Sequence, residues 1–159
     1  MGRKAAAPRK ATQDHRVPLT DLVAIRVIHL ADVISRAATL VFEKQYGLNN
    51  SELRALFVLH EEHPLTAAEL SRRARIDKAW VSRSIDSLHK RGLVSRKAHP
   101  KDSRMTLISP TAAGVELTQK LAPIAWERQT RLLAGLSQQE AFRVIETLER
   151  NANDLLANP

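Results

Sequence analysis

Residues 65–96 read LTAAELSRRARIDKAWVSRSIDSLHKRGLVSR, and they predict two short helices joined by a few residues. Thr66 and Glu69 have the spacing of a capping box, in which the hydroxyl accepts from the third helical amide and the carboxylate accepts from the cap's own amide. Asp77 is placed to cap a second helix, which Gly92 ends. This arrangement is typical of a helix-turn-helix.

The second helix of the pair has two chemically different faces. Its apolar side chains recur at spacings of four and three and therefore share one face: Val81, Ile85 and Leu88. Small, polar and charged side chains occupy the opposite side: Lys78, Ala79, Ser82, Arg83 and Asp86. We expect the apolar face to pack against the rest of the domain and the polar face to be free to bind a ligand.

A basic β-hairpin is predicted directly after Gly92. Residues 93–98 and 104–109 have strand-like composition, and the polar stretch 99–103, which contains Pro100, is the expected loop. A helix-turn-helix followed by such a hairpin predicts a winged helix-turn-helix, in which the second helix enters the major groove and the hairpin covers the flanking backbone or minor groove.

The positive charge of the chain is concentrated in this same region. The 159 residues carry 25 Lys and Arg against 17 Asp and Glu, a net charge of +8, and residues 71–104 alone hold eleven bases and three acids. Such a window is the electrostatic footprint of a polyanion-binding surface. The alternative is that these charges form an ordinary solvated face. This interpretation has to be weighed against the helix-turn-helix pattern in the same region.

Long helices are expected on both sides of this region. Apolar residues from Leu19 to about Tyr46 cover more than one stripe, with Gly47 as the C-cap, so this helix should also contact a second subunit. Asn49 or Asn50 is expected to cap another helix, which Pro64 ends.

Two further helices should follow the hairpin. One begins at Ser109, Pro110 or Thr111 and is expected to kink at Pro123. After a break at Gly135, Ser137 and Glu140 form a second capping box, and the last helix has an apolar stripe of Phe142, Ile145, Leu148 and Leu155.

These residues resemble the MarR family of transcriptional regulators. Residues 65–96 resemble its helix-turn-helix, and Asp102-Ser-Arg104 followed by residues 109–114 looks like its wing signature, Asp-x-Arg and then Leu-Thr-x-x-Gly. The likeness covers about residues 20–155. It implies a mainly α fold with a small β-wing, in which a winged helix-turn-helix lobe sits on a helical dimerisation base. The expected organisation is a disordered basic arm over 1–18, a dimerisation region over 19–47 and 111–157, and a DNA-binding region over 48–110.

The resemblance also implies a function. It predicts a cytoplasmic homodimer that binds a palindromic double-stranded DNA operator and represses transcription until a small organic anion, such as an aromatic acid or a thioester, releases it. A non-specific architectural DNA-binding protein without an effector is the alternative. A protein-interaction module for an acidic partner is a third interpretation.

Carried over residue by residue, the resemblance implies a set of DNA contacts. The recognition-helix positions are Lys78, Ala79, Trp80, Ser82 and Arg83, and the backbone-positioning places are Thr66 and Ser71. Arg104 is the wing-tip arginine, Asp102 the acid that orients it, and Arg96, Lys97 and Lys101 are phosphate neighbours.

Three positions depart from the family pattern: Trp80 replaces a small hydroxyl residue, Pro110 replaces leucine, and Ser84 stands where an apolar residue is usual. For Trp80 two interpretations are open, contact with a thymine methyl or packing toward the neighbouring helix.

An effector site is expected on the first two helices. Arg26, His29, Val33 and Arg36 share one face of the first helix, where cations could receive a carboxylate, and Arg54 and His60 are further candidates on the second. The alternative is that Asp32 and Arg36 form a surface pair, that Arg26 is solvated and that His29 is a core residue.

No catalytic, metal or cofactor site is expected. The chain has no Gly-rich phosphate loop or nucleophile elbow, and His60 and His63 are three residues apart, which suits interaction with a helix C-terminus better than a protease zinc site. Without cysteine, disulfides, thiolate metal sites and thiol-based redox sensing are excluded. The chain has no run of eighteen apolar residues, which argues against a membrane span. Its basic start MGRKAAAPRK is followed by ATQDHRVP and not by an apolar core, which argues against a signal peptide.

Overall fold

The computed structural model describes residues 18–158, which form two compact units divided at Asn50 and Ser51. Each unit is described by itself. The predicted basic arm over 1–18 lies outside the described residues except for Pro18. Over residues 18–158, every helix is too short or too polar to cross a membrane.

The first unit is almost entirely helical, as predicted for residues 19–46. Its elements are η1 (Leu19–Asp21), α1 (Val23–Ala38), the π-helical turn η2 (Thr39–Glu43) and α2 (Lys44–Tyr46). Gly47 has a φ of 63° and ends the run as the predicted C-cap. The sequence did not indicate two interruptions, an extended Leu22 with a ψ of 136° and the π turn.

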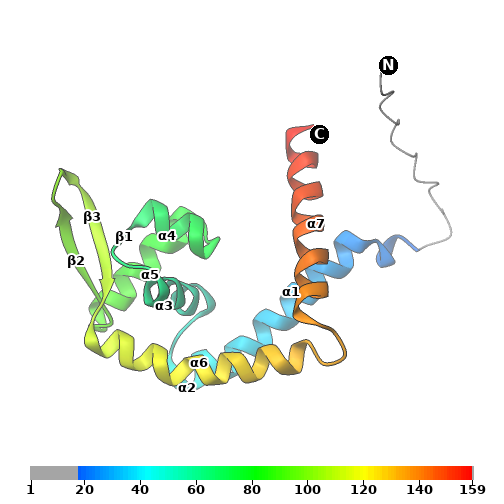
Figure 1. The fold of residues 1–159 in the computed structure, drawn as a ribbon, viewed down its shortest axis with the longest axis horizontal. Coiled ribbons are helices and arrows are strands. Elements are labelled where there is room, and N and C mark those ends of the chain that lie inside the picture. Colours follow the sequence, from blue (N-terminus) through cyan, green and yellow to red (C-terminus); the bar gives the residue numbers. More distant parts are fainter. Residues whose placement is uncertain (1–17, 159) are drawn as a thin grey trace, which may run out of the picture. The chain divides into compact units, whose positions relative to one another are not determined.

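The second unit contains the helix-turn-helix, the wing and two long helices (Figure 1). In chain order its elements are α3 (Asn50–Glu61), β1 (Leu65–Thr66), α4 (Ala67–Ala74), α5 (Lys78–Lys90), β2 (Val94–His99), β3 (Asp102–Pro110), α6 (Ala112–Leu132) and α7 (Gln138–Ala157). The described structure is therefore mainly helical with a small sheet, as predicted. Pro123 lies inside α6, and the kink expected there stays a prediction.

The wing differs from its prediction in two details. The strand β3 is longer than predicted and β2 ends one residue later, so that only Pro100 and Lys101 lie between them, whereas the sequence predicted a loop over 99–103. The sheet has a third strand and the antiparallel order β1-β3-β2, with Leu65 opposite Ile108. Because β1 is only two residues long, no alternating pattern could reveal it.

The core of the second unit draws on α3, α4, α5, α6 and the strands β2 and β3. Its largest fully buried side chains include Leu56, Leu59, Leu70, Val81 and Leu88. The predicted packing face of α5 is confirmed, since Val81, Ile85 and Leu88 are all buried. Ser84 is buried beside them, in the place where the family pattern favours an apolar residue.

The start of α6 is anchored to the start of the wing. Thr111 caps α6 by accepting a hydrogen bond from the amide of Gly114 at 3.1 Å, and its hydroxyl donates to the carbonyl of Gly92 at 2.6 Å. The amide of Thr111 donates to the carbonyl of Leu93 at 3.0 Å. A Cβ built on Gly114 would lie 2.1 Å from that same oxygen, so only glycine permits the approach.

Candidate DNA-binding surface

The exposed face of α5 carries the predicted recognition residues. Its exposed side chains include Lys78, Ala79, Trp80, Ser82, Arg83 and Asp86. Asp77 caps the helix by accepting a hydrogen bond from the amide of Ala79 at 2.8 Å, as the sequence predicted. The first turns of α5 therefore offer two small residues between longer polar and aromatic ones.

Trp80 lies on this exposed face and not in the core. Its side chain is 53% exposed, and the guanidinium carbon of Arg83 lies 4.1 Å from the centroid of its ring. This geometry is a cation–π contact between residues one helical turn apart. Of the two interpretations of Trp80, packing toward the neighbouring helix is the one that this exposure disfavours.

The turn between α4 and α5 is held by hydrogen bonds from side chains. The buried hydroxyl of Ser71 donates to the carbonyl of Ile76 at 2.7 Å. Arg54 of α3 donates to the carbonyls of Ala74 and Arg75, the latter at 2.6 Å, and so satisfies the C-terminus of α4. Burial and the neighbouring charge of Arg75 lower the pKa of Arg54. The sequence suggested Arg54 for an effector, but its guanidinium serves this turn.

Arg75 continues this arrangement toward the C-terminal helix. It adopts the left-handed conformation with a φ of 50°, and its guanidinium pairs with Glu149 of α7. Arg75 and Glu149 are 74 positions apart in the chain, and no local sequence pattern could indicate their contact. The ion pair links α7 to the helix-turn-helix.

The N-terminus of α4 has the predicted capping box. Glu69 donates its amide to the Thr66 hydroxyl at 3.3 Å, and its carboxylate accepts from the Thr66 amide and hydroxyl at 2.8 Å each. These hydrogen bonds lower the pKa of Glu69. Thr66 and Ser71 are each 8% exposed and use their hydroxyls within the fold, so a DNA contact through these side chains stays a prediction.

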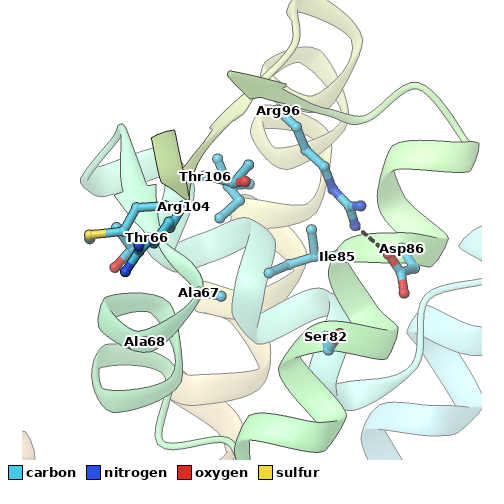
Figure 2. Close-up of a pocket in the computed structure, with 11 residues that line it drawn as sticks. Thr66, Ala67, Ala68, Ser82, Ile85, Asp86, Arg96, Arg104 and Thr106 are labelled. Atoms are coloured by element: carbon cyan, nitrogen blue, oxygen red, sulfur yellow. Dashed lines mark hydrogen bonds and ion pairs between the residues drawn. The ribbon is translucent and has the colours of Figure 1, made fainter. Parts of the chain in front are cut away.

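The wing is tied to α5 by an ion pair that the sequence did not indicate. Arg96 of β2 pairs with Asp86 of α5, and this hydrogen bond lowers the pKa of Asp86 (Figure 2). The side chains of Lys97, Lys101 and Arg104 are exposed. Arg96 thus has a structural partner as well as its predicted place near phosphates.

Asp102 acts on the backbone of the wing tip. Its carboxylate accepts a hydrogen bond from the amide of Arg104 at 3.0 Å, and the resemblance predicted Asp102 as the acid that orients this arginine. By fixing the chain two residues on, Asp102 positions Arg104 through the main chain.

A hollow of about 390 Å³ lies between α4, α5 and β3. Its lining includes Thr66, Ser82, Asp86, Arg96 and Arg104. In Figure 2, Arg96 reaches across to Asp86, and Arg104 and Thr66 are drawn among the lining residues. Of the predicted DNA-contact residues, Thr66, Ser82, Arg96 and Arg104 are therefore brought together around this hollow.

The other effector candidates are divided between two hollows. Arg26, His29 and Val33 line one of about 460 Å³ on α1, where Arg26 pairs with Asp21 at 3.4 Å. His60 lines one of about 340 Å³ bounded by α3, α6 and α7, together with the aromatic side chains of Phe57, Trp126 and Phe142.

Among residues 18–158, no three His, Asp or Glu side chains are grouped so that they could hold a metal ion. His63 instead contacts the carbonyl of Leu59 at 2.9 Å through Nδ1, at the end of α3. This contact agrees with the predicted role of these histidines at a helix C-terminus.

Comparisons with known proteins address the family directly. A family model described as "MarR family" matches residues 46–105. The uncharacterized HTH-type transcriptional regulator YkoM of Bacillus subtilis (strain 168) is 30% identical over 131 residues, which cover 79% of this chain and 85% of that protein.

Solved structures of regulators share the fold. The S. aureus MepR–DNA complex matches with a TM-score of 0.73 and 20% identity, over 83% of this chain and 96% of that chain. The PcaV transcriptional regulator of Streptomyces coelicolor, in complex with its natural ligand, matches with a TM-score of 0.70 and 22% identity, over 86% and 96% of the two chains.

Proposed function

The chain belongs to the MarR family of DNA-binding transcriptional regulators, and from this premise we propose that it is a homodimeric repressor. In this proposal it binds a palindromic operator through α5 and the wing, and a small organic anion releases it. Residues 48–110 form the DNA-binding region and residues 19–47 and 111–157 the dimerisation region. The basic arm adds phosphate contacts.

The observation that carries the proposal is the division of α5 into two faces. Val81, Ile85 and Leu88 are buried, while Lys78, Ala79 and Arg83 are exposed on a helix that directly follows a helix-turn-helix turn. A major groove about 12 Å wide accepts one α-helix, and the N-terminal residues of that helix reach the base edges. Ala79 and Ser82 permit close approach because they are small.

The wing supplies the phosphate contacts in this proposal. Lys97, Lys101 and Arg104 are exposed, and β2 is tied to α5 through the pair of Arg96 and Asp86. Cations that neutralise phosphates contribute affinity without sequence information, and their contribution falls as the salt concentration rises. Arg104 at the wing tip has the length to enter a minor groove.

A second copy of the chain accounts for the apolar helices. No residue of α1 or of α7 is buried in the single chain, although both carry large apolar side chains. Exposed apolar surface of this kind on each of the two helices marks an interaction site. A twofold dimer would cover it and would present two α5 helices to half-sites one helical turn apart, roughly 10 base pairs centre to centre.

The effector is proposed to be a small organic anion. MepR was solved with DNA and PcaV with its natural ligand, so the fold accommodates both kinds of partner. The hollow beside His60 is lined by aromatic side chains, and the hollow on α1 contains Arg26 and His29. Either site combines apolar surface with groups that attract a carboxylate.

The experiment is a fluorescence anisotropy titration of the chain with DNA from upstream of its own gene and with random duplex. Each titration is run at about 50 and 200 mM salt. We expect the upstream DNA to bind at least about 10³-fold more tightly. An aromatic carboxylate or its thioester should release it, and the corresponding neutral amide is the matched control.

Equal affinity for both duplexes, with a steep salt dependence, would favour the non-specific architectural protein. Failure to bind any duplex would favour the module for an acidic protein partner. Selective binding that no carboxylate or thioester weakens would keep the regulator and remove the organic anion from the proposal.

A further inference from the structure

The guanidinium of Arg83 lies over the ring of Trp80, and the two side chains form a cation–π pair on the exposed face of α5. We infer that Arg83 reads a guanine while Trp80 contacts the methyl group of a thymine in the adjacent base pair. The inference rests on the proposed binding of α5 in the major groove and adds to it the base step that is recognised.

The Trp80 ring holds the guanidinium of Arg83 but does not use its hydrogen-bond donors. It lies 4.1 Å from the centroid of the Trp80 ring, and within residues 18–158 no hydrogen bond or ion pair engages its donors. Stacking occupies the face of the guanidinium and leaves its N–H groups free in the plane. Two parallel donors in a fixed plane match the N7 and O6 acceptors of guanine.

Asp86 would be the natural competitor for Arg83, because residues three apart on a helix are neighbours. Its carboxylate is instead engaged by Arg96 of the wing. The ion pair with the wing therefore leaves the Arg83 donors available for an acceptor outside the chain.

Trp80 presents the second contact of the pair. The indole is 53% exposed and lies in the first turn of α5, three residues after the cap Asp77. Apolar side chains recognise thymine by its C5-methyl group, which projects into the major groove. Ala79 and Ser82 are small, so neither prevents the indole from approaching the base edges.

The spacing of the pair suits two successive base pairs. Adjacent phosphates along one strand of B-DNA are separated by about 3.4 Å of helix axis. The 4.1 Å between the guanidinium and the ring centroid is close to this rise. A guanidinium in the plane of one base pair therefore places the indole near the level of the next.

The test begins with selection of bound duplexes from a random library by the full chain. The selected duplex is then titrated with each guanine replaced in turn by 7-deazaguanine, which lacks the N7 acceptor, and each thymine by deoxyuridine, which lacks the methyl group. A methylphosphonate series, which removes the charge of single phosphates, tests whether Arg83 contacts the backbone instead.

The variants are Arg83→Ala and Trp80→Ala, with Arg73→Ala as the matched control. Arg73 is an exposed arginine of α4 that pairs with Glu62 and lies outside the proposed contact set. Because Trp80 and Arg83 are exposed, their replacement should leave the fold intact, and circular dichroism checks this before the titrations.

We expect the loss of affinity caused by a base change to depend on whether the side chain that contacts this base is present. One 7-deazaguanine should weaken binding by the native chain on the order of 5- to 150-fold and should hardly affect Arg83→Ala. Deoxyuridine at the neighbouring pair should weaken binding by the native chain about fourfold, the value of one buried methyl group, and should leave Trp80→Ala unchanged. Arg73→Ala should respond to both bases as the native chain does.

Four outcomes would overturn the inference. Indifference to 7-deazaguanine at every position would remove the guanine contact. A loss of affinity through one methylphosphonate that disappears in Arg83→Ala would make Arg83 a phosphate contact. Enrichment of no sequence at all would overturn the inference together with the proposed function. A selected operator that ignores the Arg83 and Trp80 variants would overturn the inference alone.

Discussion

Helices α5 and α1 both carry large apolar side chains, but these side chains have different surroundings. On α5, Val81, Ile85 and Leu88 are buried within the second unit. On α1, no residue is buried, and side chains such as Ile28 and Leu30 remain more than half exposed. The helix α7 resembles α1 in this respect, since it too has no buried residue.

The difference shows what an amphipathic pattern establishes and what it leaves open. The spacing of apolar residues identifies the face that avoids water, and it is equally clear in α5 and α7. It does not identify the partner that covers this face. For α5 the partner is the rest of the helix-turn-helix, whereas for α1 and α7 the proposed partner is a second copy of the chain.

The largest effects should distinguish these two kinds of face. Leu88 is fully buried, so Leu88→Ala should lower the free energy of unfolding by about 2–5 kcal/mol while two chains remain associated. Ile145 of α7 is 49% exposed in the single chain, and Ile145→Asp should place an unpaired charge in the dimer interface. We expect the dissociation constant of the dimer to rise at least about tenfold.

Denaturant unfolding and analytical ultracentrifugation over a dilution series would measure the two quantities. Ile145→Leu is the matched control and should associate as the native chain does. If Ile145→Asp remained fully dimeric, α7 would not be the covered face. If Leu88→Ala dissociated without loss of stability, the contrast between the two faces would be wrong.

A second contrast concerns two exposed cations of the second unit. Arg104 lies on the wing, whereas Lys120 lies on α6 and pairs with Glu116 at 2.7 Å. Arg104→Ala should weaken operator binding by about 1–3 kcal/mol and leave the unfolding transition unchanged. Lys120→Ala should change neither. Equal binding of both variants, measured by anisotropy, would remove the wing from the DNA-binding surface.

The smallest expected effects concern the two capping boxes, one in each kind of region. Thr66→Ala in α4 and Ser137→Ala in α7 should each cost about 0.5–2 kcal/mol of stability. The loss of stability for Thr66→Ala should lie at the upper end of this range because Thr66 is buried, whereas the contacts of Ser137 are exposed. Thermal unfolding of the two variants beside the native chain would measure this, and a larger loss for Ser137→Ala would contradict it.

Both capping boxes should also make the stability of the fold depend on pH. Hydrogen bonds from Thr66 lower the pKa of Glu69, and those from Ser137 lower the pKa of Glu140, from the ordinary value of 4.5. The stabilisation is therefore fully present above the unfolded pKa and is lost as the pH falls through the lower folded pKa. The difference between the native chain and Glu69→Gln should accordingly disappear in acid.

The features that sequence predicted correctly depend on residues close together in the chain. Both capping boxes, the cap Asp77 and the left-handed glycines Gly47 and Gly92 follow from spacings of a few residues. The packing face of α5 follows from a period of three to four residues. These local rules were sufficient to predict the helix-turn-helix and its wing.

The features that sequence missed depend on contacts between distant residues. The pair of Arg96 and Asp86 joins two different elements, and Arg54 reaches carbonyls 20 and 21 positions away. The strand β1 exists only because β3 passes beside it. None of these contacts has a periodicity that the sequence could reveal, and the effector role of Arg54 stays a prediction.

Gly114 has a consequence for how the chain tolerates change. The joint between α6 and the wing consists of backbone carbonyls, the cap Thr111 and the space left by a missing Cβ. None of these parts depends on which side chains occupy the exposed face of α5. The recognition residues are therefore free to diversify toward new operators while the joint stays constant, and substitutions at Gly114 itself should be the least tolerated in this part of the chain.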